Sequence, residues 1–113
     1  MVAKNNLIKI KKIVKKYIEK VDNLYDIKAA YIFGSYIKGN FNEDSDIDVL
    51  IVSDDFTGDI FDDTVALMKI RRSVDTRIEP HPFKTKDFND TNPFIKDIKS
   101  NLLKISAWNF GGF

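Results

Sequence analysis

Two acidic residues two positions apart, Asp46 and Asp48, are the best candidates for metal binding in this 113-residue chain. They precede the apolar run Val49–Val52, which is typical of a buried strand. Side chains alternate between the faces of a strand, so both carboxylates would project from one face. Paired like charges attract a divalent cation, and Mg²⁺ favours carboxylate oxygens together with water and phosphate oxygens. An isolated pair is more simply a solvated strand edge or a helix-capping cluster, so a second feature is needed.

Gly34 and Ser35 provide that second feature, because they follow a short β-branched and aromatic run, Ile27–Phe33, that predicts a buried strand. A short helical segment, Ser35–Lys38, is expected next. The first N–H groups of a helix lack internal partners and can bind an anion, and Ser35 adds a hydroxyl donor. The alternative is a simple turn in which Ser35 caps the helix. Phosphate donors ending one strand and acids beginning the next would meet at one sheet edge, where a triphosphate and its metal share a pocket.

Charge is distributed unevenly, although the formal net charge is only +1. Residues 1–20 contain seven lysines, whereas Phe41–Asp63 contains nine acids and no Lys or Arg. Crowded carboxylates repel one another unless water or bound cations neutralise them, so a metal site is expected in this acidic block. The lysines are most simply the solvated face of an amphipathic helix, with contact to nucleic acid or an acidic partner as the alternative. The chain lacks interleaved aromatic residues and a base-reading motif, which argues against polymerase activity on nucleic acid.

Hydrophobic spacing predicts an α+β fold, a small mixed β-sheet flanked by helices, in one domain spanning residues 1–113. Pro80 and Pro82 are expected to interrupt or border the third strand. The closing aromatic residues Trp108, Phe110 and Phe113 have no clear periodicity. The predicted elements are a helix at Asn5–Asp22, a strand at Ile27–Phe33, a helical turn at Ser35–Lys38, a strand at Asp46–Val52, a helix from Ile60 to Arg71 or Arg72, a strand at Ser73–Ile78 and a helix from Asn92-Pro93 to Ile105.

Composition narrows the functional classes. The chain has no cysteine, which excludes disulfides and thiolate metal sites and leaves oxygen atoms as the expected metal ligands. No apolar run approaches membrane-spanning length, and lysines interrupt the first apolar stretch, unlike a signal peptide. We therefore expect a cytoplasmic protein that folds alone or as a small homo-oligomer.

The segment from Gly34 to Val52 resembles the signature of the minimal nucleotidyltransferases, a family of the polymerase-beta-like nucleotidyltransferase superfamily. That signature is Gly-Ser, ten intervening residues, Asp-x-Asp and an apolar strand, and Gly39 and Ser45 also match it. The resemblance implies the polymerase-beta-like fold and an ATP triphosphate held by Gly34 and Ser35. It also implies two Mg²⁺ ions bound by Asp46, Asp48 and a third carboxylate on a later strand.

Asp75 is the preferred candidate for this third carboxylate, and Glu79 is the alternative. Asp75 follows Val74, as the family's third acid usually follows an apolar residue, and strand spacing would put Asp75, Arg77 and Glu79 on one face. Either acid could instead simply pair with a nearby arginine. His81, the only histidine, lies between two prolines, and a structural or exposed role is favoured over contact with the nucleotide or acceptor.

The resemblance implies in-line attack of an acceptor hydroxyl on the α-phosphate of a nucleoside triphosphate, with release of pyrophosphate. Two metal ions would stabilise the attacking and leaving oxygens. Chain length leaves no room for an acceptor-binding domain, so the favoured function is an Mg²⁺-dependent protein adenylyltransferase, the antitoxin of a toxin–antitoxin system that modifies a HEPN-type partner. One alternative is transfer to a small molecule such as an aminoglycoside, with the acceptor site formed across a dimer. The other is a non-catalytic module that neutralises its partner by contact.

Overall fold

The computed structural model describes residues 2–39, 41–42 and 44–105. The aromatic residues beyond 105 lie outside the described residues. The helices are α1 (Val2–Asp22), α2 (Ser35–Lys38), α3 (Ile60–Arg71) and α4 (Pro93–Ile98), with short 3-10 turns at Thr85–Asp87 and Lys99–Asn101, and the strands are β1 (Ile27–Phe33), β2 (Ile47–Ser53), β3 (Ile78–Phe83) and β4 (Leu103–Lys104).

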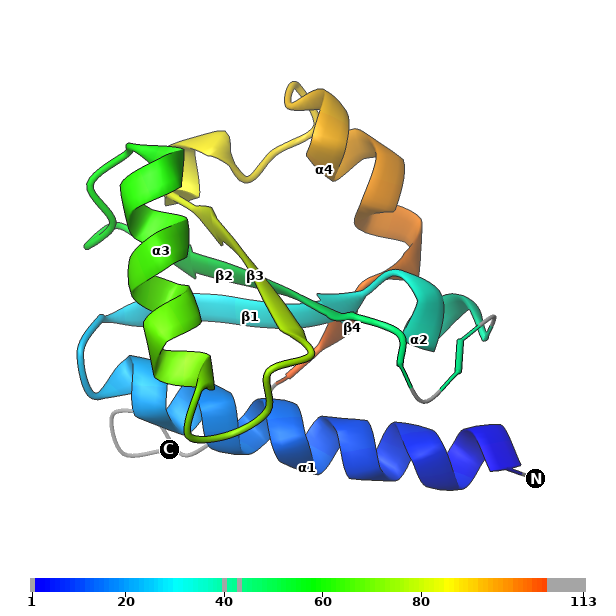
Figure 1. Cartoon of the computed structure of the whole chain (residues 1–113). Coiled ribbons are helices and arrows are strands. Elements are labelled where there is room, and N and C mark those ends of the chain that lie inside the picture. The colour runs from blue at the N-terminus through cyan, green and yellow to red at the C-terminus, as the bar shows by residue number, and fades with distance from the viewer. Residues whose placement is uncertain (1, 40, 43, 106–113) are drawn as a thin grey trace.

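The strands form one four-stranded sheet in the order β3-β2-β1-β4 (Figure 1). Strand β1 is antiparallel to both β2 and β4, whereas β2 and β3 are parallel. Helix α1 runs beneath the sheet, α4 lies above it, and α3 stands beside β3. The predicted mixed sheet flanked by helices is therefore confirmed. No helix among the described residues has the length and hydrophobicity needed to cross a bilayer.

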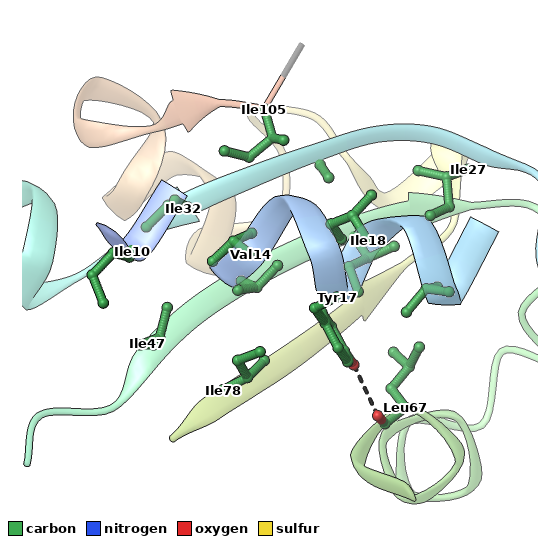
Figure 2. Close-up of a cluster of buried hydrophobic side chains, with 14 of the residues drawn as sticks. Ile10, Val14, Tyr17, Ile18, Ile27, Ile32, Ile47, Leu67, Ile78 and Ile105 are labelled. Atoms are coloured by element: carbon green, nitrogen blue, oxygen red, sulfur yellow. Dashed lines mark hydrogen bonds between the residues drawn. The ribbon is translucent and has the colours of Figure 1, made fainter. Parts of the chain in front are cut away.

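The larger hydrophobic cluster fills the space between the sheet and helices α1 and α3 (Figure 2). Helix α1 contributes Ile10, Val14, Tyr17 and Ile18, at the three- and four-residue spacing that produces one apolar stripe. The Tyr17 hydroxyl donates a hydrogen bond of 2.8 Å to the backbone carbonyl of Leu67 in α3. This bond joins the two helices, because a buried phenol needs a polar partner.

A smaller cluster covers the opposite face of the sheet, beneath α4. Strand β2 supplies both clusters by alternation: Val49 and Ile51 face α1, whereas Leu50 and Val52 pack with Ile95 of α4. This alternation explains why the run Val49–Val52 is wholly apolar. Asp48, in the same alternating series as Leu50, therefore belongs to the α4 face.

The prediction of a third strand at Ser73–Ile78 is wrong. The chain turns there, with the N–H groups of Val74 and Asp75 both donating to the carbonyl of Arg71. The strand begins instead at Ile78 and contains Pro80 and Pro82. These prolines are tolerated because β3 is an edge strand, and residues two apart direct their missing N–H groups to the same, unpaired side.

The last predicted helix is too long. Helix α4 begins at Pro93, as expected, and Asn92 caps it by accepting from the N–H groups of Phe94 and Ile95. It ends at Ile98, and the chain then extends along β1, pairing Leu103 with Ile32. Pairing with the open side of β1 satisfies backbone groups that would otherwise face solvent, which overrides the helical spacing of the apolar residues.

Candidate active site

The Gly34 backbone lies directly against the carboxylate of Asp48. A Cβ atom at residue 34 would lie 2.3 Å from Asp48 Oδ2, so no other residue fits without displacing this acid. Gly34 also has φ 82° and ψ −149°, a conformation accessible essentially to glycine alone. The structure thus brings the glycine-serine turn and Asp48 together. Ser35, the first residue of α2, follows this contact directly.

Helix α2 is stabilised by backbone bonds to Gly34 and Ser35. The N–H groups of Ile37 and Lys38 donate to the Gly34 carbonyl, and that of Gly39 donates to the Ser35 carbonyl. The N–H groups of Ser35 and Tyr36, as the first of the helix, have no partner within it. They and the Ser35 hydroxyl are donors available to an anion beside Asp48.

Glu79 on β3 is the neighbour of Asp48 across the parallel β2–β3 pair. Partial desolvation, hydrogen bonding with Asp46 and the negative charge of Asp48 raise the pKa of Glu79 above its usual range. This shift reflects three carboxyl groups crowded at one place. Asp46 itself is exposed and immediately precedes β2.

His81 lies two residues beyond Glu79 on the same face of β3. Its Nε2 atom is 3.3 Å from Asp48 Oδ1, and both side chains are about one-quarter exposed. The ring packs edge-on against Phe33 and is stacked with Phe94. The favoured expectation of a structural or exposed role for His81 therefore misses its contact with Asp48.

Asp75 lies in the turn before β3, where it pairs with Arg77 at 2.8 Å. Hydrogen bonding from Arg77 holds the pKa of Asp75 below its usual range. Arg77 Nη1 also donates to the hydroxyl of Tyr36, which in turn donates to the carbonyl of Asn42. Asp75 thus helps hold the loop before Asp46, whereas Glu79 is the acid that lies beside Asp46 and Asp48.

Several carboxylates of the acidic block hold loops or cap a helix instead of lining this site. Asp63 is buried and accepts from the N–H groups of Thr57 and Gly58, and Asp59 caps α3 by accepting from Asp62 N–H. Asp54 accepts two hydrogen bonds from Thr85, which lower its pKa. Helix caps and loop contacts thus account for much of the sequence's acidic excess.

A cleft of about 720 Å³ extends from Asp46 and Glu79 along the outer edge of β3. Helix α3 supplies Ile60 and Met68 to one wall, and Phe94 of α4 contributes to the lining. The volume is within the range of small-ligand sites. The acidic group, formed by Asp46, Asp48 and Glu79, thus opens onto a cleft on the β3 side and faces the Gly34-Ser35 turn on the β1 side.

These residues fit a divalent cation. Asp48, Glu79 and His81 each offer a ligand atom, and these atoms lie within 4.8 Å of one another. Asp46 adds a carboxylate through its contact with Glu79. Mg²⁺ prefers negatively charged oxygen ligands such as these carboxylates. The N–H and hydroxyl groups of the Gly34-Ser35 turn are placed to donate hydrogen bonds to a phosphate bound to that ion.

Sequence reasoning offered Glu79 only as the alternative to Asp75, and it did not foresee the grouping of His81 with Asp48. The usable signal was Ile78-Glu79, which has the same apolar-then-acidic order as Val74-Asp75, followed by an alternating Glu-Pro-His-Pro pattern. That pattern puts the two functional side chains on one face and the prolines on the other.

Comparison with known proteins supports this interpretation at the level of sequence. Residues 10–110 match the model of the nucleotidyltransferase domain. The chain is 32% identical over 100 residues to "Putative protein adenylyltransferase MJ1379" of Methanocaldococcus jannaschii, covering 88% of this chain and 97% of that protein. It is 35% identical over 81 residues to "Putative protein adenylyltransferase MJ0604" of the same organism, covering 69% and 81%.

Two solved structures share the fold. One, described as a "putative nucleotidyltransferase from Sulfolobus solfataricus", has a TM-score of 0.67 at 21% identity and covers 92% of this chain and 86% of its own. The other, described as a "toxin-antitoxin with AMP-PNP", has a TM-score of 0.56 at 17% identity and covers 87% and 73%. At these identities the likeness establishes the fold alone. With the sequence match over residues 10–110, which confirms the resemblance found in the Gly34–Val52 signature, the chain belongs to the nucleotidyltransferase-domain family.

Proposed function

We propose that this protein is an adenylyltransferase that transfers AMP from ATP to a hydroxyl group of a protein partner in the cytoplasm and releases pyrophosphate. The observation that carries the proposal is the contact of Gly34 with Asp48, with Glu79 on the other side of that aspartate. The names of the Methanocaldococcus relatives, both protein adenylyltransferases, support a protein acceptor.

In this proposal Gly34 and Ser35 bind the triphosphate through backbone N–H groups and the serine hydroxyl. Asp46, Asp48 and Glu79 hold two Mg²⁺ ions, with Glu79 in the role that the sequence assigned first to Asp75. Bound Mg²⁺ would neutralise phosphate charge and stabilise the attacking and leaving oxygens. The close fit of Gly34 fixes the Asp48 carboxylate relative to the groups that bind phosphate. This matters because misplacement of reacting groups lowers the reaction rate.

The reaction forms one bond and breaks one bond at the α-phosphorus. The acceptor oxygen attacks that phosphorus, the bond to the bridging oxygen of the β-phosphate breaks, and pyrophosphate leaves with the electron pair. The acceptor proton passes to the carboxylate of Glu79, which borders the cleft beside Asp46. Asp46 and Asp48 carry the remaining negative charge of the site.

The acceptor reaches Glu79 through the cleft along β3, because the Gly34-Ser35 turn occupies the opposite side of Asp48. The proposed partner is a HEPN-type toxin, with this chain as its antitoxin. The fold shared with a protein described as a "toxin-antitoxin with AMP-PNP" supports a toxin as partner and an adenine nucleotide as donor, whereas the HEPN class rests on the family resemblance of the sequence.

Incubation with ATP, Mg²⁺ and the partner encoded beside this protein tests the proposal. ATP labelled at the α-phosphate should label the partner, whereas ATP labelled at the γ-phosphate should not. The double variant Asp46→Asn/Asp48→Asn should abolish labelling. Label on an aminoglycoside instead of a protein would favour the small-molecule enzyme, and neutralisation of the partner by the double variant would favour simple binding.

A further inference from the structure

One potential nitrogen ligand for a metal, the imidazole of His81, lies beside the acidic group. Its Nε2 atom lies 3.3 Å from Asp48 Oδ1, and ligand atoms of Asp48, Glu79 and His81 all lie within 4.8 Å of one another. Two ligand atoms bound side by side to one ion at about 2.1 Å lie about 3 Å apart. The existing separation between the nitrogen and the carboxylate oxygen is therefore already close to that of two ligands on one cation.

The sheet itself creates this arrangement. Asp48 and Glu79 are cross-strand partners, and His81 follows Glu79 on the same face of β3. Asp46 lies two residues before Asp48, immediately outside β2, whereas Asp48, Glu79 and His81 all lie within strands. Strand positions are more rigid than loop positions, which suits a metal ligand.

The imidazole is also held in place. Its ring contacts Phe33 edge-on with centroids 5.0 Å apart and stacks on Phe94 at 5.6 Å. About one-quarter of the side chain remains exposed, so an ion can reach it from solvent. A ring fixed on two sides and open at the acidic group has the orientation that a ligating histidine requires.

Nitrogen changes which ion the site prefers. Mg²⁺ binds oxygen atoms almost exclusively in proteins, whereas imidazole is a good ligand for first-row transition metals. The affinity of such a site rises in the order Mn²⁺, Fe²⁺, Co²⁺, Ni²⁺. We propose that His81 is a direct ligand of one of the two metal ions, so that this position binds Mn²⁺ or Co²⁺ in preference to Mg²⁺. This inference rests on the proposed function for the presence of a metal site and adds a ligand and a selectivity to it.

A single histidine and no cysteine make the test direct, because every imidazole signal in tag-free protein comes from His81. Protein with ¹⁵N-labelled histidine is titrated with Mn²⁺ at pH 8 and studied by pulsed electron paramagnetic resonance. Coupling of the manganese electron spin to the histidine nitrogen is expected, with and without a non-hydrolysable ATP analogue. The labelled wild-type protein needs no substitution, so misfolding cannot confuse the result.

Two variants measure the contribution to affinity. His81→Gln retains a polar group able to reach Asp48, and His81→Phe retains a ring between Phe33 and Phe94. Both should weaken Co²⁺ binding by about tenfold or more while changing Mg²⁺ binding much less, measured by calorimetry. Equal losses for both ions would overturn the inference.

The outcomes separate this inference from the proposed function. Bound Mn²⁺ without nitrogen coupling, together with Mg²⁺-dependent AMP transfer, would overturn the ligand role of His81 and leave the transferase intact. Failure of Mn²⁺ and Mg²⁺ to bind, with or without the nucleotide analogue, would overturn both.

Discussion

The Gly34 backbone packs so closely against Asp48 that a Cβ atom added at residue 34 would lie only 2.3 Å from Asp48 Oδ2. Gly34→Ala must therefore displace the carboxylate or the turn. We expect AMP transfer to fall about 100-fold or more, since misplacement of this order in an active site has that effect. Initial rates of α-labelled AMP transfer would measure the loss.

Gly39→Ala is the matched control for this prediction. Gly39 also has a positive φ, of 89°, but among the described residues beyond its chain neighbours nothing lies within 4 Å of a Cβ added there. Both variants should lose about 1 kcal/mol or more of stability through backbone strain, whereas only Gly34→Ala should lose most of its activity. Equal activity losses would mean that strain, and not contact with Asp48, is responsible.

The two candidates for the third carboxylate can be separated by substitution. Glu79→Gln preserves shape but removes a charge beside Asp46 and Asp48, and the rate of transfer should fall by about 10² to 10⁴-fold. Asp75→Asn should retain most of the activity, because Asp75 is paired with Arg77. The reverse result in the labelling assay would favour Asp75 as the third carboxylate.

The pairing of Asp75 with Arg77 predicts a pH-dependent contribution to stability. Because Arg77 lowers the pKa of Asp75 in the folded protein, the contribution is present above the unfolded-state value, about 4, and is lost as the pH falls through the lower folded value. Asp75→Asn should cost about 1–2 kcal/mol at pH 7, and the difference from wild type should shrink below pH 4. Urea unfolding at several pH values would measure this difference.

Asp90→Asn is a suitable comparison, because Asp90 pairs with Lys99 at 2.7 Å but both side chains are about half exposed or more. An exposed pair contributes little, so this substitution should change the unfolding free energy by less than about 0.5 kcal/mol. A larger loss than in Asp75→Asn would contradict the assignment of the stronger role to the Arg77 pair.

Tyr17→Phe removes the hydrogen bond that joins α1 to Leu67 of α3. The loss should be about 1 kcal/mol, because a buried hydrogen bond between the two helices is removed. Burial raises the pKa of Tyr17 well above its usual range, so the wild-type protein should lose stability above about pH 10, where the unfolded phenol ionises. The variant should lack this part of the alkaline transition in guanidinium titrations.

Features set by short-range geometry were predictable from the sequence. Strand β1 and helix α2 occur at the predicted residues, and the mixed sheet follows from the order of apolar runs. The proximity of Gly34 to Asp48 follows from two consecutive strands paired antiparallel, with Phe33 opposite Asp48. These inferences needed only alternation of side chains and a short connection.

The choice between Asp75 and Glu79 as the proposed third carboxylate depended on long-range register, which periodicity does not encode. Val74 and Asp75 have the spacing of a strand but lie in a turn, whereas the true strand contains two prolines that usually argue against one. Only the parallel pairing of β2 with β3 puts Glu79 beside Asp48. Likewise, the apolar spacing of the last segment gave no sign that Leu103 would join the sheet next to β1.

The prolines of β3 also limit how another chain can approach. A strand at the rim of a sheet normally offers a row of amide hydrogens to any extended peptide, and such addition leads to fibres or to recognition by strand insertion. Pro80 and Pro82 have no amide hydrogen to offer on that rim. A partner chain at this edge must therefore be recognised through its side chains. The same lack of amide hydrogens protects the sheet edge that carries Glu79 from self-assembly.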